Sequence, residues 1–220
     1  MRLLVILSIV GGLFYAYNQQ MIPGLNTPVS AYSDSGEAEI ILYTSKDCGS
    51  ACSDIVKELR QRRAKFEEVQ LPYYDPEDPL TQQYEAHGGS GRLPYMVSGD
   101  NHGVVSMEYE VAAQLALTFG EKYLKSHEKK LYKKHFDASG NPIVVMYGAQ
   151  WCGYCRKLEK ELVADNVEFI EIDLDGHHNK KAIARTMHIG GYPTSWYGFR
   201  RVGGRGDYKS VKRTIKMASR

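Results

Sequence analysis

The hydrophobic and polar positions of the chain predict one order of structural elements, and they predict it twice. In the first half, the apolar run 39–43 predicts a short strand, and Ile55, Val56 and Leu59 recur at helical spacing. Further strands are predicted at 66–71, 92–97 and near 104–105, and helices at 81–86 and from Glu108. The second half repeats the order, with strands at 142–147, 167–174 and 195–199 and helices at 151–162, 180–187 and 208–217. This alternation indicates an α/β fold, and the segment 108–135 joins the halves as a helix broken near Gly120.

Another apolar run, at residues 3–17, precedes both halves and follows Arg2. As a helix it spans about 23 Å, which is short of the ~30 Å hydrocarbon core of a bilayer and typical of a secretory signal. The small residues 29–31 are suited to cleavage but lie far from the run, so we favour an uncleaved anchor over a removed signal. Both interpretations export the chain, because no Lys or Arg follows the run until Lys46. We expect a protein of the inner membrane facing the periplasm, or a soluble periplasmic protein if the signal is cleaved.

These patterns divide the chain into five segments. Residues 1–17 form the signal anchor or signal peptide, and 18–37, with their Pro, Gly and Ser residues, form a flexible tether. Two domains are predicted at 38–120 and 138–220, with a helical connector at 121–137. The formal net charge of +2 is too small to indicate a nucleic-acid partner.

The four cysteines fall in two close pairs, Cys48 with Cys52 and Cys152 with Cys155. A disulfide that closes a long loop restricts the unfolded state most, and these loops are too short for that purpose. Pairs this close indicate redox couples or half of a metal site.

Cys152-Gly153-Tyr154-Cys155 is a C-x-x-C motif at a predicted helix start. Unpaired backbone N–H groups and the helix dipole stabilise a thiolate at the first position. Cys155 shares a face with Leu158 and Leu162. We therefore expect Cys152 to be an exposed nucleophile and Cys155 a buried resolving thiol. The alternatives are a structural disulfide, or a zinc site completed by the other two cysteines or by His177 and His178.

The run 147–155 resembles the active-site strand and turn of thioredoxins and protein disulfide isomerases, and Gly153-Tyr154 is similar to the inner dipeptide of bacterial Dsb-type disulfide isomerases. The segment 191–194 resembles the cis-proline loop of the same superfamily. The resemblance covers residues 138–220. It implies that Pro193 shapes the site and that the backbone of Tyr192 pairs with a substrate peptide, and we expect Trp151 and Tyr154 to contact substrate.

The sequence differs from thioredoxins and disulfide isomerases at one position that matters for their chemistry. Thioredoxins and disulfide isomerases carry a buried acid six residues before the first cysteine, where it relays protons to and from the resolving thiol. Met146 occupies that position here. In lacking the acid, the sequence resembles the Dsb-type isomerases, which lack it too.

The first pair resembles glutaredoxins over residues 38–120, through Tyr43-Thr44 before Cys48 and Leu93-Pro94 downstream. The resemblance implies that Cys48 and Cys52 are redox-active and that Leu93 and Pro94 contact substrate. The pair differs from the glutaredoxin motif in having three intervening residues instead of two. In a helix this spacing places the Cα atoms about 6 Å apart, a separation that a disulfide can span. The glutaredoxin double glycine is replaced by residues 106–108, which weakens support for glutathione binding. A second redox couple and a structural disulfide in a domain that binds substrate or partner both stay open.

The sequence predicts two thioredoxin folds in tandem, preceded by an N-terminal transmembrane or signal helix. The expected function is that of an exported thiol–disulfide oxidoreductase, a reductase or isomerase acting on cysteines of exported proteins or of a redox partner protein. We expect no cofactor and no metal, and membrane contact only through an uncleaved N-terminal helix. The alternative is a membrane-tethered thioredoxin-fold adaptor whose disulfides are structural.

Overall fold

The computed structural model describes residues 31–72, 75–203 and 206–219. The predicted N-terminal helix at 1–17 and the tether as far as residue 30 lie outside these residues. Among the helices within the described ranges, none combines the length and the apolar character needed to cross a membrane.

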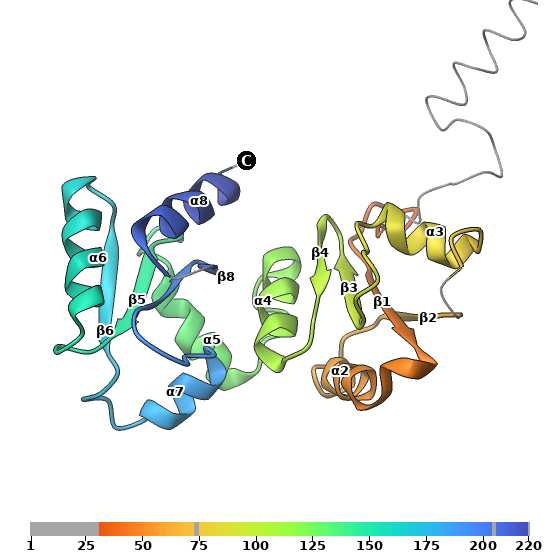
Figure 1. Cartoon of the computed structure of the whole chain (residues 1–220), viewed down its shortest axis with the longest axis horizontal. Helices are drawn as coiled ribbons and strands as arrows, with labels where there is room; N and C mark the ends of the chain where they lie inside the picture. The colour runs from red at the N-terminus through yellow and green to blue at the C-terminus, as the bar shows by residue number, and fades with distance from the viewer. Residues whose placement is uncertain (1–30, 73–74, 204–205, 220) are drawn as a thin grey trace, which may run out of the picture. The chain divides into compact units, whose positions relative to one another are not determined.

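The described residues form two compact units, each built on its own four-stranded sheet (Figure 1). Residues up to Asp54 and Lys65–Val105 form the first unit. Ile55–Ala64 and the residues from Ser106 onward form the second. Both sheets have helices beside them, so the chain is of the predicted mixed α/β class.

The first sheet has the strand order β2-β1-β3-β4. The central strand β1 (Ile40–Ser45) pairs in parallel with β2 (Glu67–Leu71) and antiparallel with β3 (Tyr95–Ser98), which pairs with β4 (Asn101–Val104). Helix α2 (Gly49–Gln61) follows β1, and α3 (Pro79–Ala86) begins where the Asp78 carboxylate accepts the Leu80 and Thr81 N–H groups. Ala31 is buried in this unit's core, so the folded unit includes residues from Ala31 onward.

The second sheet repeats this plan in the order β6-β5-β7-β8. The central strand β5 (Val144–Gly148) is parallel to β6 (Phe169–Asp173) and antiparallel to β7 (Thr194–Tyr197), which pairs with the short β8 (Arg200–Arg201). Alternate residues of a strand face opposite sides of its sheet. Val144 and Met146 therefore face a core shared with α6 (Gly153–Ala164) and α8 (Tyr208–Ala218), whereas Val145 and Tyr147 face the opposite core.

The segment between the two sheets forms helices α4 (Glu108–Phe119) and α5 (Ser126–Tyr132), and α7 (Lys180–Thr186) lies later in the same unit. The predicted break is found at Gly120, whose positive φ of 59° ends α4. Ala112 and Ala116 of α4 are buried with Val145 and Trp196 in one core cluster. Helix α4 is therefore part of the packed body of the second unit.

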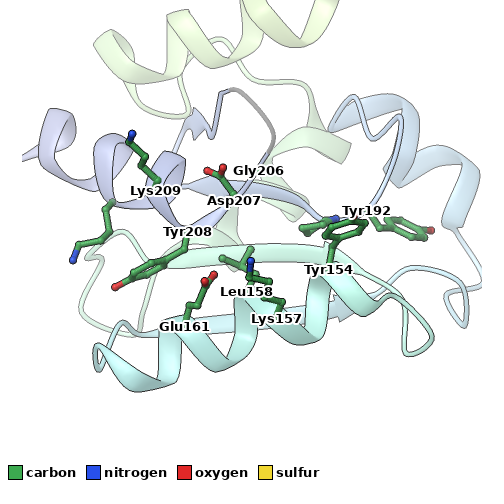
Figure 2. A pocket seen from close by; sticks show the side chains of 11 residues that line it. Tyr154, Lys157, Leu158, Glu161, Tyr192, Gly206, Asp207, Tyr208 and Lys209 are labelled. Carbon is green, nitrogen blue, oxygen red and sulfur yellow. The ribbon is translucent and has the colours of Figure 1, made fainter.

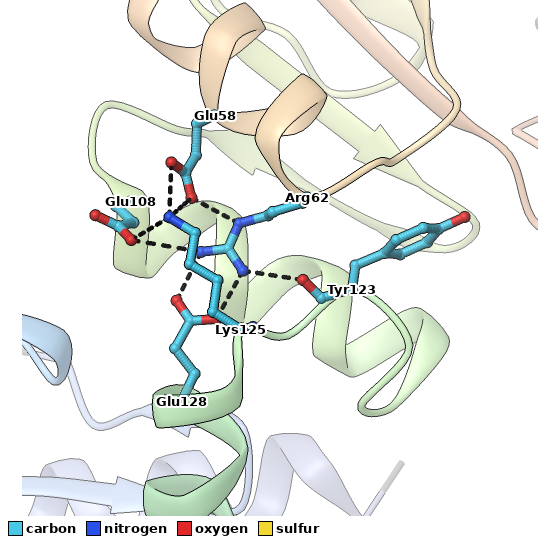
Figure 3. Close-up of polar contacts among 6 residues, drawn as sticks. All are labelled: Glu58, Arg62, Glu108, Tyr123, Lys125 and Glu128. Carbon is cyan, nitrogen blue, oxygen red and sulfur yellow. Dashed lines mark hydrogen bonds and ion pairs between the residues drawn. The ribbon is translucent and has the colours of Figure 1, made fainter.

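A buried polar cluster within the second unit is centred on Arg62 (Figure 3). The Arg62 guanidinium, fully buried, donates to both oxygens of Glu128 at 2.6 and 2.7 Å and to the backbone oxygen of Tyr123 at 3.0 Å. It also pairs with Glu58, which in turn pairs with Lys125. These contacts join the end of α2 to the segment that contains α5.

Candidate active site

The second cysteine pair lies where β5 passes into α6. Cys152 occupies the position that caps the helix, and Cys155 lies in its first turn. Cys155, Leu158 and Leu162 share the buried face of α6, as their spacing predicts. The strand and the helix together fix both sulfurs at one end of the sheet.

Local geometry at Cys152 favours a negative charge on its sulfur. The two cysteines form a disulfide with Cα atoms 5.2 Å apart, and the Cys155 backbone N–H donates to Sγ of Cys152 at 3.1 Å. An N–H group aimed at the sulfur, added to the positive end of a helix, stabilises a thiolate over a thiol.

Cys152 is less exposed than the sequence indicated, with 4% of its surface accessible against 0% for Cys155. It belongs to a core cluster against which Tyr192 packs. It also borders an open cavity of about 370 Å³, together with Trp151, Tyr154 and Tyr192. In the disulfide this sulfur is bonded to Sγ of Cys155, so only the reduced pair offers a thiolate for attack.

The residues predicted to contact substrate come together around the pair. Trp151 and Tyr154 are among the most exposed large side chains of the described chain, at 73% and 79%. The ring of Tyr192 lies 5.9 Å from that of Trp151, and the peptide bond from Tyr192 to Pro193 is cis. The site thus combines a disulfide with an aromatic, solvent-facing rim.

Asp175 links two parts of this rim. The sequence alone does not indicate this role, because Asp175 lies in the polar loop that follows β6. Its carboxylate accepts the Trp151 indole N–H at 2.6 Å and the Tyr192 hydroxyl at 3.1 Å, and it also pairs with Lys180. Hydrogen bonds from Lys180, then Trp151 and Tyr192, lower the pKa of the Asp175 carboxyl. Asp175 therefore holds the residue before the first cysteine and the residue before the cis-proline in one network.

A larger groove of about 740 Å³ extends from the site between α6 and α8 (Figure 2). Tyr154, Tyr192 and Pro193 form the end nearest the cysteines, and Leu158 lines the groove from α6. Charged side chains of both signs line the rest: Lys157, Glu161, Asp207, Lys209 and Lys212. Apolar, aromatic and charged groups in one open groove suit an extended peptide.

The first pair also forms a disulfide, with Cα atoms 5.5 Å apart, close to the separation that the spacing predicted. Cys48 ends a short 3-10 helix, while Cys52 is buried inside α2. The Leu93–Pro94 bond is cis, but the Leu93 side chain packs against the core of its unit and Pro94 is buried. Pro94 and Pro193 thus both follow a cis peptide bond, but Pro94 is buried in its unit whereas Pro193 is partly exposed.

One group of three metal-ligand side chains comes together in the described part of the chain: Glu108, His127 and Glu128. Both carboxylates are already engaged, Glu128 by Arg62 and Glu108 by Lys125. We assign no metal to this group.

Comparisons with known proteins agree with this geometry. Residues 123–205 match the family model described as Thioredoxin. Over 77 residues, 34% of its length, the chain is 35% identical to a glutaredoxin from Pseudomonas aeruginosa and covers 92% of that protein.

Similar solved structures include glutaredoxin C1 from Populus tremula x tremuloides, at 22% identity and a TM-score of 0.30, covering 42% of this chain and 89% of that one. Another is the glutaredoxin from Methanosarcina mazei Go1, at 19% identity and a TM-score of 0.29, covering 37% of this chain and 97% of that one. The two sequence matches carry the assignment. The chain belongs to the thioredoxin superfamily: it is a relative of glutaredoxins, and its residues 123–205 match the Thioredoxin family model.

Proposed function

We propose that this chain is an exported thiol–disulfide oxidoreductase that acts on cysteines of other proteins, with Cys152 as its nucleophile. The observation that carries the proposal is the placement of Sγ of Cys152 at the start of α6, where it accepts the Cys155 N–H and borders an open cavity. The superfamily membership supports dithiol–disulfide chemistry in general.

The reaction has two exchange steps. The Cys152 thiolate attacks a substrate disulfide, forming a Cys152–substrate bond and releasing the other substrate sulfur as a thiolate. Cys155 then attacks Sγ of Cys152, and the electron pair of the mixed disulfide leaves on the second substrate sulfur. The substrate disulfide is reduced to two thiols while the Cys152–Cys155 pair is oxidised, and the reverse sequence oxidises a substrate dithiol.

Protein clients are favoured over small thiols by the groove between α6 and α8. The groove begins at Tyr192 and Pro193, where the superfamily resemblance implies backbone pairing with an extended peptide. It continues along Leu158 and Tyr208, which offer apolar contacts beyond the reacting cysteine.

A second candidate function concerns the first unit alone, as a domain whose disulfide is structural. Burial of Pro94, together with packing of Leu93, favours this interpretation for the first unit. The first pair then stabilises a domain that binds a client or partner, while the second pair performs the chemistry.

Insulin reduction by the full chain tests the proposal. We expect Cys152→Ser to abolish turnover and Cys48→Ser to leave most of it. Turnover that survives Cys152→Ser contradicts the choice of nucleophile, and loss of turnover in Cys48→Ser alone moves the chemistry to the first pair. In Cys155→Ala the mixed disulfide does not resolve, so clients captured from a periplasmic extract identify the substrate class.

We propose export from the apolar run at 3–17 and the lack of positive charge between it and Lys46. Fractionation of cells, with protease access to the outer face of the inner membrane, tests this placement. Protection of the chain from protease in spheroplasts contradicts it.

A further inference from the structure

Met146 stands where thioredoxins carry a buried acid, and in the sheet it is paired with an acid on the neighbouring strand. The register of β5 and β6 places Met146 beside Glu171. Glu171 and Phe169 point to the same face of the sheet because they are two residues apart, and Phe169 packs in the core cluster that contains Cys155. The acid is therefore on the face of the sheet that α6 covers.

Gly148 leaves room for Glu171 and Cys155 to approach each other. A Cβ atom at Gly148 would lie 2.9 Å from Oε1 of Glu171 and 3.0 Å from Sγ of Cys155. The carboxylate oxygen and the sulfur therefore lie no farther apart than the sum of these two distances, a span that a single water molecule bridges. Cys155 is fully buried, whereas a quarter of the Glu171 side chain is exposed, at 23%. The carboxylate thus connects a buried sulfur to solvent.

From this arrangement we propose that Glu171 is the proton acceptor and donor for the resolving thiol of Cys155, in place of the acid absent at Met146. The inference rests on the proposed function, since it concerns the second step of the same exchange. In that step the Cys155 thiol gives its proton to Glu171 as its sulfur bonds to Sγ of Cys152. The Cys152–substrate bond breaks, its electron pair leaves on the substrate sulfur, and Glu171 returns the proton to water.

Arg156 holds the acid in place. Its guanidinium pairs with Oε1 of Glu171 and with Glu159 at 2.5 Å. On β6, Asp173 follows Glu171 by two residues and is paired with Gly148 in the sheet register, and its carboxylate accepts the Asp175 backbone N–H at 3.2 Å. On α8, Lys212 is paired with Asp165 and contacts the ring of Tyr208. Glu159 therefore offers a matched control: it pairs with the same guanidinium and is not one of the groups that meet at Gly148.

A two-phase absorbance experiment tests the proposal on the full chain. Cys48→Ser and Cys52→Ser are introduced in every arm, so that only the second pair reacts. The reduced protein is mixed with an aromatic disulfide whose released thiolate is coloured. Attack by Cys152 releases one coloured thiolate, and resolution by Cys155 releases the second, so the two phases report the two steps separately.

We expect Glu171→Gln to leave the first phase unchanged and to slow the second near neutral pH by about a hundredfold, the lower end of what general bases contribute. The difference should shrink at high pH, because a thiol ionises without help above its ordinary pKa of about 8.5. Glu171→Asp, which keeps a carboxylate, should retain a faster second phase, and Glu159→Gln should resemble the parent.

A second phase slowed equally by Glu171→Gln and Glu159→Gln, or slowed by the same factor at every pH, overturns the proposal in favour of a structural role. A first phase no faster than that of a free thiol overturns the proposed function itself, and the role of Glu171 with it.

Discussion

Replacing Arg62 with alanine removes the positive charge at the centre of the buried cluster in the second unit. The Arg62 side chain is completely buried and Glu128 is 2% exposed, so water screens their interaction little. The variant leaves the Glu128 carboxylate buried, and it still accepts the Lys125 backbone N–H at 2.7 Å but has lost its positively charged partner. Removing one partner of a buried ion pair costs about 3–5 kcal/mol, which raises the unfolding equilibrium constant by roughly two to four orders of magnitude.

Denaturation followed by tryptophan fluorescence measures this loss, because Trp151 and Trp196 both lie in the second unit. Lys212→Ala is the matched control: it breaks an ion pair of similar length, 2.9 Å, between side chains that are 59% and 45% exposed. It should cost far less than Arg62→Ala, because water and salt screen an exposed pair. Replacing Arg62 and Glu128 together by Met should cost less than Arg62→Ala, since no unpaired charge remains. A loss below about 1 kcal/mol for Arg62→Ala would refute the reasoning.

Two further predictions concern pH and the rim of the site. Burial lowers the pKa of His135 to about 4, and an unfolded histidine titrates near 6.5, so the unfolded chain binds the proton more tightly. The free energy of unfolding should therefore fall by about 3 kcal/mol as the pH drops from about 6.5 to about 4 and then level off. Denaturation at a series of pH values should show this slope in the parent and not in His135→Phe. An equal slope in both proteins would contradict the assignment. Asp175→Ala frees Trp151 and Tyr192, so the KM for a protein disulfide should rise roughly two- to tenfold while the reaction of Cys152 with a small disulfide is unchanged; equal loss with both substrates would show that the network supports the cysteines themselves.

Features of the fold that depend on local sequence were predictable. The apolar run before Cys152 is the strand β5, and the spacing of Cys155, Leu158 and Leu162 places all three on the buried face of α6. The break at Gly120 followed from a single residue that tolerates a positive φ. In each case the residues that carry the signal lie within a single strand or within one or two turns of a helix.

Strand β8 was missed because its two residues are arginines, which carry no apolar alternation. Its existence depends on pairing with β7, where Arg201 lies opposite Trp196. The limited exposure of Cys152 was missed for a related reason, since the cover comes from Tyr192, forty residues farther along the chain.

The polar contacts that shape the site also join distant residues. Trp151 and Asp175 are 24 positions apart, and Arg62 and Glu128 are 66 apart. Nothing in the local pattern of Asp175 or Glu171 distinguishes them from surface acids. Their roles become visible only when the register of β5 with β6 and the absence of a side chain at Gly148 are known.

The most direct test of the account is the pH dependence of Cys152 alkylation in the reduced full chain, measured beside a free thiol. Cys48, Cys52 and Cys155 are replaced by Ser, so that one sulfur reports. Because a backbone N–H and the start of α6 stabilise the thiolate, the account predicts that half of Cys152 is ionised at a pH well below that of the free thiol. Ionisation at the same pH as the free thiol, or above it, would contradict the central claim that this sulfur is the activated nucleophile.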